Sequence, residues 1–162
     1  MKVYGIVAEY NPFHNGHKFQ IDDIRKKAGD CAIVSVMSGN YVQRAETAVM
    51  SKYARAKAAL LGGVDLVLEL PMPYAISSAE RFAYSSVHIL NSLGAVTDIS
   101  FGSECGSISI LRKAVEALYD ENVNLKLKAE LKNGVSYPAA RFAAVRDVFG
   151  AEKAPGLSEP NN

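Results

Sequence analysis

Short apolar runs rich in β-branched residues alternate with longer helical patterns in this sequence of 162 residues. A short run that is apolar throughout is typical of a strand buried on both faces. Buried strands that alternate with helices predict a parallel sheet with helices on both sides. We therefore predict an α/β fold, a Rossmann-like doubly wound parallel sheet. The predicted strands cover residues 3–8, 31–37, 64–70 and 96–101.

The helical patterns have boundaries that suit helices. Gly29 follows the first pattern, Gly62 follows the second, and Pro138 opens the last. In doubly wound sheets, ligands bind beyond the carboxyl ends of the strands. The predicted helices cover residues 16–28, 47–61, 77–93, 108–119, 123–132 and 138–149, and the candidate ligand loops cover 9–16, 38–46, 71–77 and 102–107.

Composition narrows the protein class. Eighteen basic and seventeen acidic residues give a net charge of +1, so no strong overall attraction to nucleic acid or anionic membrane is expected. Cys31 and Cys105 are isolated, with no metal-like spacing, which favours free thiols in a reducing compartment. No apolar stretch approaches the ~20 residues of a membrane span. We therefore expect a cytoplasmic protein that does not enter membranes.

The segment EYNPFHNGHKF, residues 9–19, follows the first predicted strand directly. It contains no GxGxxG pattern, so the dinucleotide-binding fingerprint is absent. His14 and His17 instead open the first helix, with Gly16 between them. A helix N-terminus attracts anions, and residues at i and i+3 lie on one helix face. The segment therefore favours phosphate binding by two imidazoles.

Two other interpretations of the histidines stay open. They could be metal ligands, although zinc sites usually need three or four protein ligands and the only other histidine is His88. They could also be structural, with one capping the helix and the other packed. The position after the first strand favours phosphate.

Several longer blocks carry a family resemblance. HNGH resembles the HxGH motif of the nucleotidyltransferase superfamily, which includes class I aminoacyl-tRNA synthetases. Together the blocks are similar to the tRNA(Met) cytidine acetate ligase family, and the resemblance covers most of the chain. The blocks are GIVAEYNPFHNGH, VMSGNYVQR, SKYARAKAALLGGVDLVLELP, SSAERFAYSSVHILNSLGAVTDISFGSE and SEPNN.

The resemblance implies an ATP-dependent ligase. Such an enzyme joins acetate to AMP, releases pyrophosphate, and transfers the acetyl group to N4 of the wobble cytidine in elongator tRNA(Met). It also implies that His14 and His17 are catalytic, and that Mg²⁺, held mainly by the phosphates, shares their charge. The implied ATP contacts are Val7, Ala8, Glu9, Tyr10, Asn11, Pro12, Phe13, His14, Asn15, Gly16, His17, Gly102, Asn161 and Asn162.

The acetate pocket must be small and close to the α-phosphate. We place its rim at Ser38, Gly39 and Asn40, although an ordinary turn explains this segment equally well. Glu9 could orient a histidine or a ribose, or form a structural hydrogen bond, and Glu104 could lie near the adenine.

The sequence also departs from the family. Ala45 and Thr47 stand where members have a glycine and a proline. The family continues beyond the last residue of this chain, into a helical part and a second, basic phosphate motif. We therefore expect residues 1–162 to form a single nucleotidyltransferase-like domain that is truncated at its C-terminal end, with doubtful transfer to tRNA and an incomplete RNA surface.

Two rival functions remain. The first is an adenylyltransferase that acts on a phosphorylated metabolite and binds its second phosphate through Arg44, Lys52 or Arg55. The second is a non-catalytic module that binds nucleotide or RNA. The pattern of Lys52, Arg55 and Lys57 is more typical of a solvated helix face than of either site.

Overall fold

The structure, a computed structural model, describes residues 1–43, 45–103 and 106–150. The chain divides into two units, Met1–Phe101 and Gly102–Asn162. The single-domain interpretation of residues 1–162 stays a prediction.

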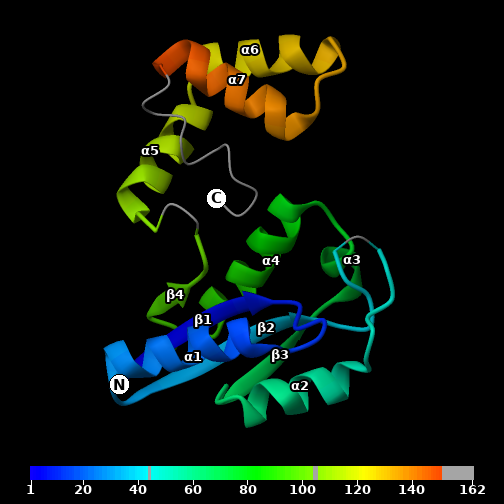
Figure 1. Cartoon of the computed structure of the whole chain (residues 1–162), viewed down its shortest axis with the longest axis vertical. Coiled ribbons are helices and arrows are strands. Elements are labelled where there is room, and N and C mark those ends of the chain that lie inside the picture. Colours follow the sequence, from blue (N-terminus) through cyan, green and yellow to red (C-terminus); the bar gives the residue numbers. More distant parts are fainter. Residues whose placement is uncertain (44, 104–105, 151–162) are drawn as a thin grey trace. The chain divides into compact units, whose positions relative to one another are not determined.

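The first unit is a parallel sheet with helices on both faces. Its four strands lie in the order β3-β2-β1-β4, and every neighbouring pair is parallel. The helices α1, α2, α3 and α4 connect them in sequence order (Figure 1). The bounds are β1 Lys2–Ala8, α1 Asn15–Ala28, β2 Cys31–Ser38, α2 Lys52–Leu61, β3 Leu66–Leu70, α3 Met72–Ala75, α4 Ala79–Ser92 and β4 Asp98–Ser100.

Side chains of β2 alternate between two apolar cores. Ile33 and Met37 belong to the core that α1 and α2 cover, and Val34 and Val36 belong to the core that contains Leu90 of α4. Because both faces of the strand are buried, the apolar run at residues 31–37 carries no polar alternation. The predicted α/β, doubly wound parallel sheet is confirmed.

The strand order fixes where a ligand is expected. The chain moves outward from β1 through β2 to β3, and then β4 pairs with the other side of β1. The topological switch point therefore lies between β1 and β4, beyond their carboxyl ends. The loop that follows β1 opens at this point, and Gln20 of α1 donates a hydrogen bond to Ser100 Oγ at the end of β4, at 3.1 Å.

The helix predicted at residues 47–61 begins only at Lys52. The preceding residues belong to a loop in which the Ala48 N–H donates to Asn40 O at 2.9 Å. Ser51 then caps the helix by accepting a hydrogen bond from the Ala54 N–H at 3.3 Å. The alanine-rich pattern predicted too early a start for this helix, because these backbone contacts outweigh local helix propensity. The short helix α3 inside the predicted loop 71–77 was also missed.

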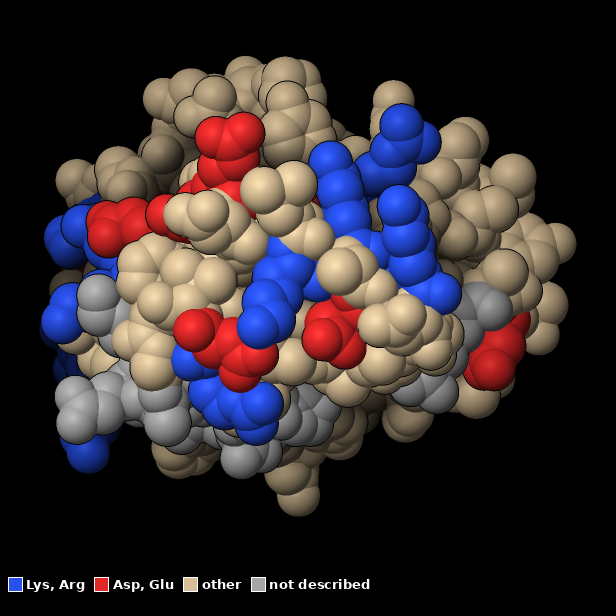
Figure 2. Space-filling model, turned by 90° about the horizontal axis from the view of Figure 1, so that it is seen from above, with Lys and Arg blue, Asp and Glu red and all other residues tan. Residues whose placement is uncertain are grey.

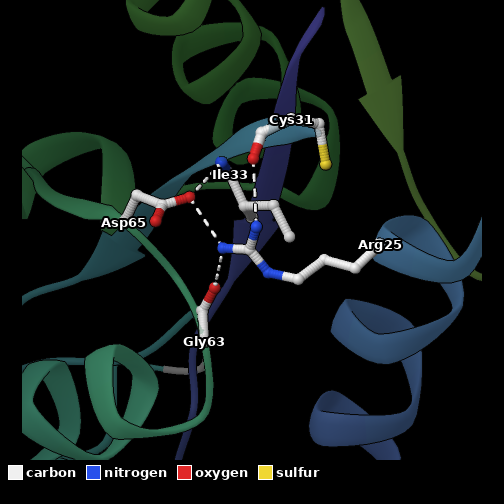
Figure 3. Close-up of polar contacts among 5 residues, drawn as sticks. All are labelled: Arg25, Cys31, Ile33, Gly63 and Asp65. Carbon is white, nitrogen blue, oxygen red and sulfur yellow. Dashed lines mark hydrogen bonds and ion pairs between the residues drawn. The ribbon is translucent and has the colours of Figure 1, made fainter. Parts of the chain in front are cut away.

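A polar cluster holds the amino-terminal edge of the sheet (Figure 3). Arg25 of α1 donates from Nη1 to Cys31 O at 3.0 Å and from Nη2 to Gly63 O at 2.7 Å. Asp65 Oδ2 accepts from Arg25 at 2.9 Å and from the Ile33 N–H at 2.7 Å. This cluster joins α1 to the starts of β2 and β3, at the edge opposite to the expected ligand site.

The second unit is helical in its described part. It contains α5 Ile108–Leu118, α6 Glu121–Lys132 and α7 Tyr137–Phe149. Small and branched apolar side chains form its core: Ala114, Ala117, Val123, Ala144 and Val145. Among the described residues after β4, the three expected helices are present and share one apolar cluster.

The charges of the molecule are mixed. Figure 2 shows Lys and Arg side chains with Asp and Glu side chains lying among them on the face that it draws. This agrees with the net charge of +1. Among the described residues, no helix combines the length and apolar character that a membrane crossing requires.

Candidate functional site

The first loop, residues 9–14, joins β1 to α1 and has an unusual backbone. Tyr10 adopts a positive φ of 48°, and the Asn11–Pro12 peptide bond is cis. A left-handed backbone is unfavourable for a residue with a large side chain. Here the Tyr10 side chain is 1% exposed and belongs to the core between the sheet and α1, which compensates for that cost. The Asn11 side chain accepts a hydrogen bond from the Val49 N–H at 2.8 Å.

The two histidines cap the first helix with their own rings. His14 is the N-cap of α1, and its Nδ1 accepts from the Gly16 N–H at 3.1 Å. His17 Nδ1 accepts from the His14 N–H at 3.2 Å. A ring nitrogen that accepts a hydrogen bond carries no proton, so each neutral imidazole carries its proton on Nε2. The hydrogen bonds therefore define one tautomer for both rings, with Nε2–H as the remaining donor.

This geometry bears on the ATP contact that the family resemblance implies at Gly16. A Cβ atom there would lie 3.0 Å from His14 Cε1, so glycine allows the imidazole to fold over the backbone. The Gly16 N–H is already bonded to His14 and is not free for a ligand. Its dipole instead polarises the imidazole, which strengthens the donor at Nε2. The His14 ring thus presents a polarised Nε2–H donor at the positively charged start of α1.

Aromatic contacts hold the rings in place. The His14 and His17 rings are stacked with centroids 3.8 Å apart. Tyr10 meets the His17 ring edge-on at 4.8 Å, and the Phe13 ring centroid lies 5.5 Å from it. Burial lowers the pKa of His17 below its ordinary value of 6.5, and the neighbouring His14 lowers it further. His17 is therefore neutral at neutral pH, as its capping role requires.

The lowered pKa of His17 predicts a loss of stability in mild acid. The unfolded chain takes up a proton at this histidine near pH 6.5, whereas the folded chain resists it until a lower pH. The free energy of unfolding should therefore fall as the pH drops through 6.5. Urea unfolding one unit above and one unit below 6.5 measures the effect. The non-titrating variant His17→Gln should show a smaller pH dependence, and an equal dependence would contradict the assignment.

A second loop, residues 39–51, is fastened to the first. Glu9 Oε1 accepts from the Gln43 N–H at 2.6 Å, which is the structural hydrogen bond that the sequence left open as one alternative. Ser38 and Gly39 are buried at the end of β2, whereas Asn40 is exposed. The proposed acetate rim thus lies beside the first loop, and its contact with acetate stays a prediction.

Arg55 of α2 connects the first loop, residues 9–14, to the second loop, residues 39–51. Its Nη2 donates to the carbonyls of Ser38, at 3.1 Å, and Gly39. Its Nη1 donates to Glu9 O, and its Nε donates to Met50 O at 3.2 Å. The side chain is fully buried, with 0% exposed. One guanidinium therefore holds the carboxyl ends of β1 and β2 and the end of the second loop.

The solvated face predicted for Lys52, Arg55 and Lys57 is wrong at Arg55. Lys57 is exposed, and Lys52 Nζ pairs with Glu69 Oε2 at 2.6 Å. Burial lowers the pKa of Arg55, and the carboxylates of Glu9 and Glu69 act in the opposite direction. The charge pattern gave no sign of this burial. The better signal is position, because Arg55 and Ala59 share the buried side of α2.

Gly62, at the end of α2, touches the aromatic support of the histidines. A Cβ atom there would lie 2.8 Å from Phe13 Cε1 and closer still to Cζ, so the ring would have to move. Its φ of −76° suits any residue, so the conflict is steric only. Phe13 packs against Tyr10 and His17, and its displacement would therefore disturb the histidine pair.

The variant Gly62→Ala is expected to lower the free energy of unfolding by about 1–3 kcal/mol, as overpacking usually does. Chemical denaturation measures this loss. Adding Phe13→Leu should recover part of it, because the smaller side chain makes room. Equal losses in the single and double variants would show that Phe13 is not the obstacle.

The remaining predicted site residues do not lie in the two loops, or they fall outside the described residues. Gly102 is exposed, two residues after β4, and begins the second unit. A Cβ atom there would have no neighbour within 4 Å. Five residues named from the sequence fall outside the described residues: Arg44, Glu104, Cys105, Asn161 and Asn162.

Comparison with known proteins identifies a family and several relatives. The chain matches the HIGH Nucleotidyl Transferase family over residues 1–162. It is 49% identical over 148 residues to the tRNA(Met) cytidine acetate ligase of Acetivibrio thermocellus, covering 90% of this chain and 36% of that protein. It is 47% identical over 165 residues to the Bacillus subtilis enzyme of the same name, covering 100% and 39%.

A solved structure is similar in both sequence and fold. The crystal structure of Thermotoga maritima TmcAL bound with α-thio ATP superimposes with a TM-score of 0.90 and 42% identity. The match covers 99% of this chain and 41% of that one. This chain thus spans about two fifths, or slightly less, of the length of these relatives. The match over its whole length shows that the chain belongs to the HIGH nucleotidyltransferase family.

Proposed function

We propose that this chain binds ATP at the first loop and joins acetate to AMP, releasing pyrophosphate. The acetyl group then passes to N4 of the wobble cytidine of elongator tRNA(Met), which releases AMP. The names of the relatives and the bound α-thio ATP of the T. maritima protein support this proposal. The observation that carries it is the pair of Nε2–H donors at the start of α1.

The reaction requires little from the protein besides position and charge stabilisation. A carboxylate oxygen of acetate attacks the α-phosphorus while the bond to pyrophosphate breaks. Negative charge then grows on the phosphate oxygens, and donors that are already oriented stabilise it. His14 and His17 supply such donors as neutral rings. No proton transfer by an enzyme group is needed, because the nucleophile is already a carboxylate.

A divalent ion is compatible with this site. Mg²⁺ usually keeps several waters and is bound through substrate phosphates and one or two carboxylates. In the described part of the chain, no group of three or more His, Cys, Asp or Glu side chains is placed to hold a metal ion. Near the loop, one oxygen of Glu9 is already bonded to Gln43. The phosphates of ATP would therefore hold Mg²⁺, whose charge would favour departure of pyrophosphate.

Pyrophosphate–ATP exchange tests the proposal. We expect exchange that depends on acetate, since acetyl-adenylate formation is reversible. Exchange driven by a phosphorylated metabolite and not by acetate would identify an adenylyltransferase instead. ATP binding with no exchange for any acceptor would identify a non-catalytic module.

Two of the three cations that the adenylyltransferase alternative could use are already paired. That function needs free cations for a second phosphate, and the candidates were Arg44, Lys52 and Arg55, of which Arg44 lies outside the described residues. Lys52 is paired with Glu69, and the donors of Arg55 are bonded to backbone carbonyls. The cytoplasmic location stays a prediction.

A further inference from the structure

A groove between α3 and α4 is unexplained by ATP or acetate. Its volume is about 620 Å³, which is large enough for a nucleotide and far larger than acetate needs. It belongs entirely to the first unit. Residues that line it are Pro71, Tyr74, Arg81, Tyr84, His88 and Ile89.

The groove carries exposed aromatic rings. The rings of Tyr84 and His88, one turn apart on α4, are nearly parallel, with an interplanar angle of 6° and centroids 6.3 Å apart. Tyr84 is 73% exposed, and Tyr74 on the α3 side is 47% exposed. Large aromatic side chains lose favourable burial when they stay in water. Parallel exposed rings in a groove therefore suit a flat, stacking ligand.

The charge of the groove favours an anionic ligand. Arg81 lies one turn before Tyr84, so its guanidinium and the two rings form one stripe along α4. None of the described residues that line the groove is acidic. A flat base next to a negative phosphate, the repeating unit of single-stranded nucleic acid, matches this combination of rings and cation.

The groove also lies at a suitable place in the fold. Pro71 directly follows the carboxyl end of β3, and the first loop follows the carboxyl end of β1. These strands are separated only by β2, or roughly 10 Å at the usual strand spacing. The end of the groove at Pro71 therefore lies at the same edge of the sheet as the candidate ATP site.

We propose that the groove binds an unpaired nucleotide of the RNA substrate, with the base stacked on Tyr84 and His88 and a phosphate next to Arg81. This inference rests on the proposed function for the identity of the RNA. It assigns to the first unit an RNA contact that is separate from the histidines.

Fluorescence anisotropy with a labelled single-stranded cytidine dodecamer RNA tests this inference. Tyr84→Ala should weaken binding by about tenfold, because stacking contributes strongly to the affinity of single strands. Tyr84→Phe should keep most of the affinity, since it keeps the ring. Arg81→Ala should reduce the slope of log affinity against log salt by about 0.7, the value for one phosphate contact.

The control is Tyr119→Ala, which removes a tyrosine that is 84% exposed in the second unit. The inference is overturned if Tyr84→Ala weakens RNA binding no more than Tyr119→Ala, which would leave the groove as a surface for another protein. Duplex RNA that binds with the same dependence on Tyr84 would also contradict base stacking.

The two proposals fail separately. Tyr84→Ala is expected to keep acetate-dependent exchange, because it does not touch the first loop. Absence of exchange in the unaltered protein, with RNA binding that still depends on Tyr84, would remove the proposed reaction and keep the groove. Acetate-dependent exchange, with RNA binding to which Tyr84 contributes nothing, would keep the proposed reaction and remove the groove.

Discussion

Replacing His14 and His17 together with alanine is expected to reduce acetate-dependent pyrophosphate–ATP exchange to background. Each ring offers one Nε2–H donor to the phosphates, and removal of one preorganised donor typically costs roughly 100-fold or more in rate. The loss should appear mainly in the rate constant for exchange, since the donors act most strongly on charge that grows during the reaction. Full exchange in the double variant would contradict the role of the histidines.

His14 is also the N-cap of α1, and this structural role must be separated from its proposed contact with phosphate. Loss of an N-cap costs about 0.5–2 kcal/mol of stability. Serine is a good N-cap, but it lacks the Nε2–H donor that His14 offers to a phosphate. His14→Ser should therefore keep the free energy of unfolding and still lose exchange. Tyr119→Ala, at an exposed position of the second unit, is the control and should leave exchange unchanged.

Arg55→Ala is expected to have the largest effect on stability. It would leave the buried carbonyls of Ser38 and Gly39 and the part-buried carbonyl of Glu9 without their partner, and each unsatisfied buried group costs about 1–3 kcal/mol. We expect a loss of at least about 3 kcal/mol, measured by chemical denaturation. Arg55→Lys is milder, because an ammonium group cannot reproduce the planar set of donors. It should still raise KM for ATP and for acetate together, since Arg55 holds both loops.

Arg25 supplies the matched control for that substitution. It also bonds to backbone carbonyls, but at the opposite edge of the sheet (Figure 3). Its side chain is 36% exposed. Arg25→Lys should cost less than about 1 kcal/mol, because partial exposure to water weakens its bonds. It should leave both KM values unchanged. If Arg55→Lys behaves in the same way, Arg55 supports the fold alone and does not position the site.

The core strands could be predicted from the sequence because a strand that is buried on both faces has a continuous run of apolar residues. Residues 31–37 are almost wholly apolar, and the structure places them between two cores. The start of α2 was harder to predict. Alanine favours a helix at Ala48, but a hydrogen bond to Asn40 holds this residue in the loop. Such a contact between loop segments leaves no periodic pattern.

Some features of the candidate site could also be predicted from the sequence, and others could not. The position of His14 and His17 at a helix start follows from the strand, the glycine and the spacing. Their tautomers do not, since these depend on which nitrogen accepts each N–H. Arg55 was missed because an arginine among lysines is usually solvated, and the carbonyls that it binds come from separate parts of the sequence.

The central claim is that two neutral imidazoles donate from Nε2 to the phosphates of ATP. Nitrogen-15 NMR of the histidine rings, recorded during an ATP titration, tests it most directly. We predict unprotonated Nδ1 and protonated Nε2 in both rings before ATP is added, and Nε2–H signals of His14 and His17 that shift on binding while those of His88 do not. Protonated Nδ1 in the free protein, or ATP binding that leaves the His14 and His17 signals in place, would contradict the account.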